Sequence, residues 1–502
     1  MSYQQFHHGG ISRRTMYRCW KRALIFLGFV IVIVLTFGKS RVKKIQEIYA
    51  LQDSIADIID RELQYMSERT IAEGDKWIPL TNINGHIYSV YLDTRPEIII
   101  KYSKADKTTW GALIVTALLP TNTQRETLTC VLQYKNSQRN IVLKKVPAQV
   151  RILNEHWDLE YSAFCVICYL SYSWEHDYEL FDNFKQLPET LGIGDNADGQ
   201  FIDVHYPKEG LSQLYEGGRG SIAVCVPVLH HNFDRPLELI EYLEYYRMMG
   251  IDHFTIYNSS VSPDVDKVLD HYKLKLTATV LDWILPSIYV YEQTLRHEGL
   301  LAALNDCLYR NTHHDGYKYV GTFDVDEFLV PRRHDNIREL IMELDSSPDR
   351  NEFAGFIFQN VYFYTMYEDD ERARGKVPYL YTRAKTKRLK KPNEARERSR
   401  YIVRGRDTVE IGSYNVWEFR EGSPMSSQRE FKELVVDPEI ALLHHYAPCE
   451  AEETGCYLKP VVIDESAVKY SNKLGERVGK VCSEIFGIAG CPPPKKRIIG
   501  FE

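Results

Sequence analysis

The most informative stretch of the sequence is Tyr317-Lys-Tyr-Val-Gly-Thr-Phe-Asp324-Val-Asp326-Glu327-Phe-Leu-Val-Pro331. It places two carboxylates two residues apart at the end of an apolar, aromatic run that is typical of a buried strand. Because strand side chains alternate between faces, we expect Asp324 and Asp326 to point the same way and to share one cation. A divalent ion held by two carboxylates, with positions left open, suits the diphosphate of a nucleotide-sugar. A D-x-D pair alone is common in solvated turns, but the flanking strand favours the metal interpretation here.

Strand and helix patterns alternate before this stretch. The predicted strands are Ser221–Leu229, His253–Tyr257 and Leu276–Leu281. One predicted helix starts near Pro236, and two others cover Val265–Tyr272 and Glu292–Asn311. Such alternation with uninterrupted apolar strands indicates a parallel sheet packed on both faces. Nucleotides bind these sheets at the carboxyl ends of the strands, where the two aspartates are expected. The sequence contains no G-x-G-x-x-G or G-x-x-x-x-G-K-[ST] motif, so a metal would have to neutralise the diphosphate.

Residues 76–215 have a different pattern of short strands separated by turn residues. The predicted strands are His86–Leu92, Glu97–Tyr102, Gly111–Val115, Thr127–Tyr134 and Tyr161–Tyr169. We expect an antiparallel, all-β, sandwich-like accessory domain. Its aromatic residues could form a carbohydrate-binding face, although aromatic residues in strands more often belong to the core.

The N-terminal region contains one uncharged apolar segment, residues 23–38, preceded by basic residues. Sixteen helical residues span about 24 Å, which is short for a membrane helix. A cleaved signal peptide and a buried helix are alternatives, but no small-x-small site follows and basic residues flank both sides. We favour a transmembrane signal anchor in a thin membrane of the early secretory pathway, with residues 1–22 as a cytoplasmic tail and the rest of the chain in the lumen.

Residues 39–75 are charged and helical in pattern, and form the predicted stem. Apolar residues recur at roughly heptad spacing at Ile45, Ile48, Ile55, Ile59 and Met66, with interruptions at Gln52 and Glu62. This pattern predicts a stem helix that could support a homodimer. The net charge of −7 argues against nucleic acid as a partner.

The ten cysteines fit an oxidising compartment. Cys19 would be cytoplasmic, so nine would be luminal and at least one would lack a partner within the chain. Cys449 with Cys456, and Cys482 with Cys491, are close enough to form local disulfides. Cys165 and Cys168 form a C-x-x-C in a predicted strand, where they would face opposite sides, so we expect them to be buried or bridged separately. The one sequon, Asn258-Ser-Ser, ends a predicted strand near the expected donor site.

With these elements in place, the chain resembles the metal-dependent GT-A glycosyltransferases, and more narrowly glycosyltransferase family 92. The matching segments are Cys225–Pro227, Gly250–Tyr257, Asp306–Asn311, Asp324–Pro331 and His444–Tyr446. The resemblance covers residues 221 to about 457. It implies an α/β GT-A catalytic domain over residues 221–460, with a Rossmann-like mixed sheet flanked by helices, and a C-terminal extension over residues 461–502.

The resemblance also implies an activity and a location. Characterised enzymes of the family are type II membrane proteins of the secretory pathway. They transfer galactose from UDP-galactose, with inversion and using manganese, onto glycans. By resemblance we expect Mn2+ or another divalent cation, a UDP-sugar donor, an N-glycan or other glycoconjugate as acceptor, and a single-pass Golgi membrane location with a luminal catalytic domain. The sequence departs from the family at Leu300, where Gly-Gln is usual, and at Tyr414, where Gly-x-His is common.

Candidate site residues follow from both arguments. Asp324 and Asp326 would bind the metal and diphosphate, and a late histidine would complete the metal site. The resemblance favours His445 over His444 for that role. Pro227 and Asn258, at the ends of the first two strands, would lie beside the nucleobase and ribose.

Inversion requires a general base to deprotonate the acceptor. The candidates are Glu410, which matches a family position, and Asp369 and Asp370 in an acidic cluster. Glu327 is expected to face away from the two aspartates. The stretch Arg372–Arg406 holds fourteen Lys or Arg residues, and is either a solvated, flexible loop or a loop near the sugar-nucleotide or an anionic acceptor.

The motifs and the resemblance together predict a metal-dependent transferase, and the resemblance implies that it inverts the donor sugar and forms a β-linked product. Two alternatives remain open, namely a non-catalytic luminal glycan-binding protein with this fold and a transferase that uses a different UDP-sugar.

Overall fold

The computed structural model describes most of the chain beyond the N-terminal region. It covers residues 40, 42–53, 60, 63 and 76–494, with gaps at 81–82, 103–107, 124–127, 136–139, 172–186, 195–199, 209–220, 290, 347–351, 422–430 and 450–454. The predicted cytoplasmic tail and the predicted anchor at residues 23–38 lie outside the described residues. Among the helices that are described, none is both long and apolar enough to cross a membrane.

The first domain is built on an eight-stranded antiparallel sheet. Its order is β1 (Ile78–Pro79), β2 (His86–Asp93), β3 (Thr109–Pro120), β6 (Tyr161–Ser171), β5 (Ile141–Ile152), β4 (Thr129–Lys135), β7 (Thr190–Ile193) and β8 (Ile202–Asp203). The first half of β5 pairs with β4 and its second half with β6, so the sheet folds over onto itself. Backbone hydrogen bonds between His205 and β2 bring the two ends together around an apolar core. As far as this domain is described, the arrangement is sandwich-like and consists of strands apart from one short helix.

The predicted strand Glu97–Tyr102 is wrong, because this segment forms helix α2 (Pro96–Tyr102). Pro96 supplies the preset φ of a first helical position, and Glu97 in the first turn suits the positive end of the helix dipole. These local signals outweigh the strand preference of the three isoleucines.

The start of the predicted stem packs on this β domain. Residues 42–53 are helical, and Ile45 and Ile48 are buried. Gln52 donates its amide to the carbonyl oxygens of Thr94 (2.8 Å) and Trp110 (2.6 Å). Ile45 and Ile48 therefore pack in the interior of their own chain, and not in the dimer interface that the stem pattern suggested. Ile55, Ile59 and Met66 lie outside the described residues.

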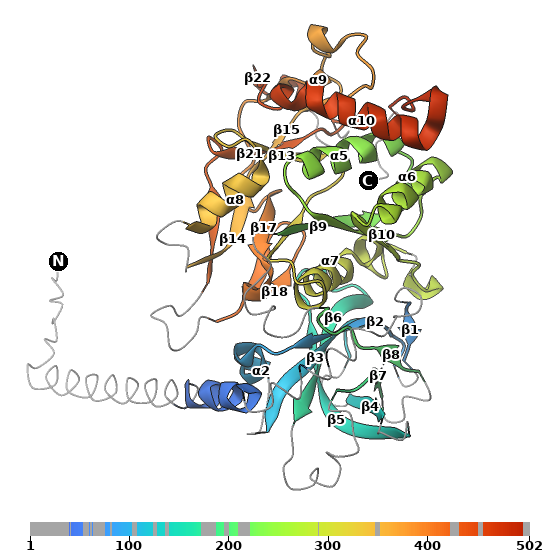
Figure 1. Cartoon of the computed structure of the whole chain (residues 1–502), viewed down its shortest axis with the longest axis vertical. Coiled ribbons are helices and arrows are strands. Elements are labelled where there is room, and N and C mark those ends of the chain that lie inside the picture. Colours follow the sequence, from blue (N-terminus) through green and yellow to red (C-terminus); the bar gives the residue numbers. More distant parts are fainter. Residues whose placement is uncertain are drawn as a thin grey trace, which may run out of the picture.

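The second domain contains a seven-stranded mixed sheet. Its order is β11 (Ala278–Asp282), β10 (His253–Asn258), β9 (Ile222–Leu229), β12 (Tyr319–Thr322), β17 (Arg400–Arg404), β14 (Phe353–Phe358) and β20 (Lys432–Val436). The first four strands are parallel, as predicted, and β17 runs antiparallel to both neighbours. Helices α5 (Pro236–Met248), α6 (Pro263–Leu274), α8 (Ile337–Ser346) and α10 (Ser471–Phe486) pack on one face. Helix α7 (Leu300–Tyr309) lies between the other face and the β domain (Figure 1).

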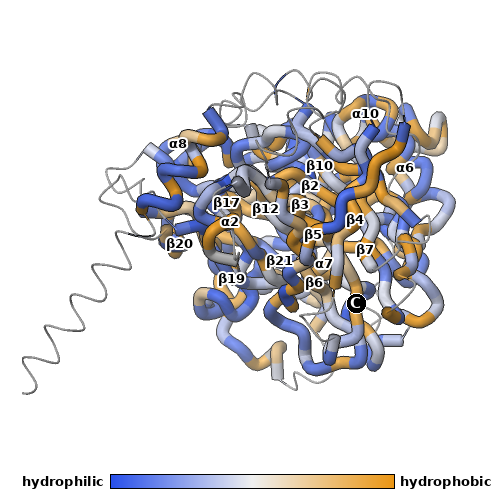
Figure 2. The backbone as a smooth tube through the Cα atoms, turned by 90° about the horizontal axis from the view of Figure 1, so that it is seen from below, coloured by the Kyte–Doolittle hydropathy of each residue, from blue (hydrophilic) through white to orange (hydrophobic). Residues whose placement is uncertain are grey.

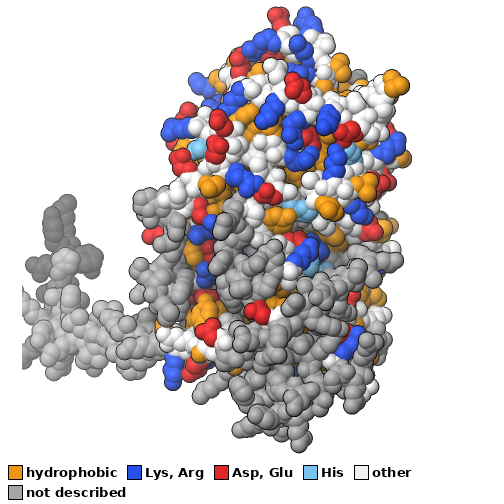
Figure 3. Space-filling view, in the orientation of Figure 1, with side chains coloured by type: hydrophobic (Ala, Val, Ile, Leu, Met, Phe, Trp, Pro, Cys, Tyr) orange, Lys and Arg blue, Asp and Glu red, His pale blue; other side chains and the backbone are white. Residues whose placement is uncertain are grey.

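Smaller sheets complete this domain. They are β13 (Glu327–Pro331) with β21 (Ala441–His445) and β15 (Asn360–Tyr362), β16 (Lys387–Leu389) with β22 (Val461–Ile463), and β18 (Thr408–Ile411) with β19 (Val416–Phe419). A short helix, α9 (Tyr381–Ala384), precedes β16. Hydrophobic stretches follow the inner strands, whereas hydrophilic ones predominate in peripheral loops (Figure 2). Basic and acidic side chains are interspersed on the upper part of the face in Figure 3.

The predicted helix Glu292–Asn311 begins later than expected. His297 (φ 46°), Glu298 (φ 51°) and Gly299 (φ 71°) adopt left-handed backbone conformations, and α7 starts only at Leu300. Left-handed residues interrupt a right-handed helix, so the chain turns sharply here.

In the part of the chain that the structure describes, four disulfides join eight of the cysteines. The predicted local pairs Cys449–Cys456 and Cys482–Cys491 are confirmed. The other two are Cys130–Cys168, within the β domain, and Cys225–Cys307, which ties β9 to α7. Cys165 is free and does not pair with Cys168, in line with the strand-alternation argument.

Removal of the Cys225–Cys307 disulfide by a double alanine substitution should lower the free energy of unfolding by about 4 kcal/mol. Both cysteines are buried, and the bond closes a loop over a sequence separation of 82 residues, which restricts the unfolded chain strongly. Urea unfolding followed by circular dichroism measures the effect. Cys165→Ala is the matched control and should change stability much less. An equal loss in both variants would contradict the assigned role of the disulfide.

Candidate active site

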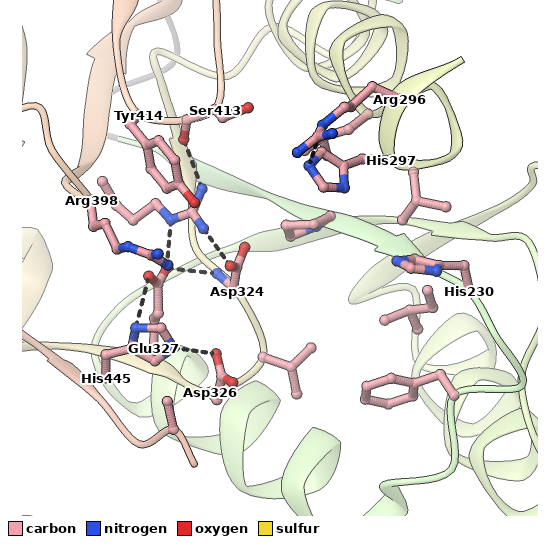
Figure 4. A pocket seen from close by; sticks show the side chains of 18 of the residues that line it. His230, Arg296, His297, Asp324, Asp326, Glu327, Arg398, Ser413, Tyr414 and His445 are labelled. Carbon is pink, nitrogen blue, oxygen red and sulfur yellow. Dashed lines mark hydrogen bonds and ion pairs between the residues drawn. The ribbon is translucent and has the colours of Figure 1, made fainter. Parts of the chain in front are cut away.

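A cavity of about 780 Å³ opens at the carboxyl ends of β9 and β12. Its walls include the end of β9, the Asp324–Glu327 turn, Arg398 and Arg400, the 413–415 loop with Trp417 of β19, and His445 (Figure 4). The β domain contributes Glu155 and Trp157. A volume of this size accommodates a nucleotide-sugar.

The two aspartates lie in a turn. The predicted strand over residues 317–331 is split, because β12 ends at Thr322 and β13 begins at Glu327 in a different sheet. A hydrogen bond from Glu327 N to Asp324 O (3.0 Å) closes the turn. The strand-alternation argument for Asp324 and Asp326 was therefore wrong, although both residues do line the cavity.

Asp326 lies beside His445. Their Oδ1 and Nε2 atoms are 3.4 Å apart, because β21 runs antiparallel to β13 and pairs His445 with Glu327. Burial disfavours the imidazolium of His445, but the Asp326 and Glu327 carboxylates outweigh burial and raise its pKa above the usual value. His444 faces the other way, is buried against the Phe363 ring, and does not line the cavity. Of the two candidate histidines, the structure brings His445 to the acidic turn.

Arg400 occupies the space between Asp324 and Glu327. Its Nε donates to Glu327 Oε2 (2.6 Å), and its Nη2 pairs with Asp324. Glu327 Oε2 also accepts from Asp324 N (3.1 Å), so this side chain faces the aspartates. The prediction that it faces away is wrong, because the turn breaks the alternation on which it depended.

Some of the side chains at this turn could serve as ligands of a hard divalent cation. Asp326 and His445 present a carboxylate oxygen and an imidazole nitrogen to the cavity, with room for phosphate oxygens beside them. Asp324 already has a cationic partner in Arg400. A second group of metal-ligating side chains, His230, His231 and Glu298, has ligand atoms within 4.8 Å of one another. Figure 4 places His230 across the cavity from His445.

The predicted nucleotide contacts differ in their placement. Pro227 lines the cavity, but Asn258 does not. The Asn258 carbonyl accepts from Trp283 N (2.9 Å) at the end of β10. Arg235, which was not predicted, lies 3.9 Å from Asp326 and over the Phe233 ring. Arg235 directly precedes Pro236, the first residue of α5. Its position at a helix N-terminus near the strand ends is the sequence signal that could have identified it as a site residue.

The three predicted general bases lie elsewhere. Glu410 is buried, paired with Arg151, and accepts from Asn154 N (2.7 Å). Asp369 pairs with Lys385 (2.8 Å) and Asp370 with Arg372 (2.7 Å), and none of the three lines the cavity. The structure therefore corrects this prediction, since the sequence pattern could not show that each carboxylate has a cationic partner away from the site.

The basic stretch Arg372–Arg406 is not one flexible loop. It contains α9, β16 and β17, and it delivers Arg398 and Arg400 to the cavity. Leu300 and Tyr414, the two departures from the family pattern, also line the cavity. The Arg400 guanidinium lies 5.0 Å from the centre of the Tyr414 ring.

The fold and site together define an α/β protein with an acidic turn at the carboxyl ends of its parallel strands. A family model described as Glycosyltransferase family 92 matches residues 220–479, just over half of the chain. The chain belongs to glycosyltransferase family 92.

The matches to individual proteins are partial in sequence or distant in structure. The beta-1,4-galactosyltransferase galt-1 of Caenorhabditis elegans is 32% identical over 112 residues, which cover 22% of this chain and only 25% of that protein. The crystal structure of S. aureus TarS 1-349 is 12% identical, with a TM-score of 0.21, covering 37% of this chain and 47% of the other. Its complex with UDP-GlcNAc gives 11% identity and a TM-score of 0.24, covering 53% and 71%. Structural similarity this low supports no further argument.

Proposed function

We propose that this protein is a metal-dependent, inverting transferase that moves galactose from UDP-galactose onto a glycan. The observation that carries the proposal is the Asp326–His445 pair in a cavity at the strand ends of a family 92 domain. The partial match to a beta-1,4-galactosyltransferase supports galactose as the sugar. A location in the Golgi membrane, anchored through residues 23–38 with the catalytic domain in the lumen, belongs to the same proposal.

The residues of the cavity divide the work of such a reaction. Asp326 and His445 would hold Mn2+ or another divalent cation, which supplies positive charge to a departing diphosphate. Arg235 and Arg398 add cationic side chains to the same cavity. Pro227 would border the nucleoside. Arg400 keeps Asp324 and Glu327 in place, so the turn has its shape before the donor binds.

Two observations favour a second candidate, a glycan-binding protein without turnover. Leu300 and Tyr414 put an apolar and an aromatic side chain where the family usually has polar ones, and both line the cavity. Asp324 is also engaged by Arg400. A transferase with a different UDP-sugar is the third candidate, because cavity volume does not distinguish hexoses.

UDP release by the full-length chain in detergent, with Mn2+ and a desialylated N-glycan, separates these candidates. We expect the fastest release with UDP-galactose among UDP-galactose, UDP-glucose, UDP-GlcNAc and UDP-GalNAc, and loss of activity on chelation that Mn2+ restores. Preference for another donor would replace galactose in the proposal. No release with any donor by a folded protein that binds glycans would favour the binding protein.

A further inference from the structure

The loop between β5 and β6, residues 153–160, is the part of the β domain that lines the cavity. Glu155 and Trp157 line the cavity, although both lie outside the segment that matches the family. Glu155 (φ 61°), Trp157 (φ 50°) and Asp158 (φ 51°) adopt left-handed backbone conformations. Such conformations in non-glycine residues are uncommon and persist only where surrounding contacts impose them.

Those contacts come from the second domain. The buried Glu410 carboxylate accepts from the backbone N (2.7 Å) and the side-chain Nδ2 (2.9 Å) of Asn154. Arg151, at the end of β5, pairs with both Glu410 and Glu418. Glu410, a candidate base by its sequence, therefore anchors the start of this loop, and the loop has a defined position over the cavity.

Glu155 is oriented by the loop that borders the acidic turn. Its carboxylate accepts from Ser413 N (3.1 Å) and Trp417 Nε1 (2.8 Å), and Ser413 O accepts from Arg400 Nη1 (2.8 Å). Asp324 and Glu327 pair with Arg400, and Asp326 lies against His445. Within the described part of the chain, Glu155 forms no ion pair with a basic side chain, which leaves its Oε2 free to accept another hydrogen bond.

Trp157 presents an aromatic surface beside this carboxylate. The residue is 46% exposed, which is unusual for tryptophan. The Arg296 guanidinium lies 5.5 Å from the ring centre, and the His297 ring meets it edge-on at 6.2 Å. An exposed indole with polar neighbours suits a pyranose ring, whose C–H face packs on the aromatic surface while its hydroxyl groups bond to the polar side chains.

We propose that the 153–160 loop is the acceptor subsite of the transferase. A pyranose residue of the acceptor packs on Trp157, and its reacting hydroxyl donates to Glu155. That hydroxyl oxygen bonds to the anomeric carbon of the donor, the bond from this carbon to the UDP oxygen breaks with its electron pair leaving on UDP, and Glu155 takes the proton. The inference rests on the proposed function and makes the β domain a part of the active site.

Kinetics of full-length variants test the subsite. The acceptor probes are methyl β-galactoside, methyl β-N-acetylglucosaminide and methyl α-L-fucoside, at saturating donor. We expect Trp157→Ala to raise the acceptor KM about tenfold, and Trp157→Phe to restore most of the affinity. Glu155→Gln retains an acceptor for Trp417 but should lower kcat by about 10²- to 10⁴-fold, with little change in acceptor KM. UDP affinity measured by calorimetry reports that each variant is folded.

Leu143→Ala, at an exposed position on β5, is the matched control and should not change either constant. An acceptor KM within about twofold of wild type in Trp157→Ala would overturn the stacking surface, and near-normal kcat in Glu155→Gln would overturn the base. If the wild-type chain shows no transfer at all, the proposed function fails. Saturation-transfer NMR with the same three glycosides then decides the subsite. A weaker transfer signal from the glycosides in Trp157→Ala than in wild type supports it, and an equal signal overturns it.

Discussion

Replacing Asp326 by asparagine should lower kcat by about 10²- to 10³-fold without unfolding the protein. Asparagine has nearly the same shape but lacks the negative charge that faces the cavity beside His445. A neutral amide is a poor ligand for a divalent cation and would leave the diphosphate without compensation. The rate of UDP release at saturating donor measures the effect, and calorimetry should show that Mn2+ no longer strengthens UDP binding.

Asp335→Asn is the control for this variant, because Asp335 is an exposed aspartate near the start of α8. It should retain wild-type kcat and UDP affinity. If Asp326→Asn turned over at the wild-type rate, the acidic turn would not be the metal and diphosphate site. The second group of ligating side chains, His230, His231 and Glu298, would then be the next place to test.

Replacing Arg400 by methionine should lower the free energy of unfolding by about 3–5 kcal/mol and abolish detectable transfer. The Arg400 side chain is only 5% exposed and that of Glu327 only 1%, so removal of the guanidinium leaves a buried carboxylate without its cation. Arg400→Lys keeps the charge but cannot donate to Glu327, Asp324 and Ser413 together, so we expect an intermediate loss. Urea unfolding monitored by intrinsic fluorescence provides the comparison.

The loss of unfolding free energy in Arg400→Met should depend on pH. In the wild type, burial already raises the pKa of Asp324 to about 7 against the opposing charge of Arg400, so removal of Arg400 would raise this pKa further. The native variant would then bind more protons than its unfolded chain above the ordinary aspartate pKa, and its stability would fall as the pH rises. The deficit relative to wild type should be smaller at about pH 5 than at about pH 8. A deficit that is constant with pH, or not reduced by a second change Glu327→Gln, would contradict this explanation.

Much of the second domain was predictable because its signals are local. The apolar runs at β9 and β10 and the proline-initiated helices α5 and α6 appear where the sequence indicated them. The same holds for the two short-range disulfides. The motif residues Asp324, Asp326 and His445 do meet in one cavity. Their backbone conformation could not be predicted from the sequence, since a D-x-D at the end of a strand and one in a turn between two sheets have the same sequence.

The electrostatic environment of the site was not predictable. Glu410 and Asp369 looked like free carboxylates, yet they pair with Arg151 and Lys385, which only folding brings near. Asp370 pairs with Arg372, two residues further along the chain. Arg400 was one of fourteen basic residues in a stretch that resembled a loop. Glu155 and Trp157 carried no signal at all, because nothing in the β5–β6 loop indicates which domain it faces.

Backbone periodicity, turn residues and short motifs were enough to establish the parallel strands, the helices α5 and α6 and the family of this chain, because these features act over a few residues. The partners of each charge, the orientation of Glu327 and the entry of the β domain into the cavity were decided by tertiary structure alone. The Glu155–Ser413 and Arg151–Glu410 contacts join residues that lie 258 and 259 positions apart in the chain. A carboxylate becomes a ligand, an anchor or a base according to which groups surround it, and that neighbourhood exists only after the two domains have packed together.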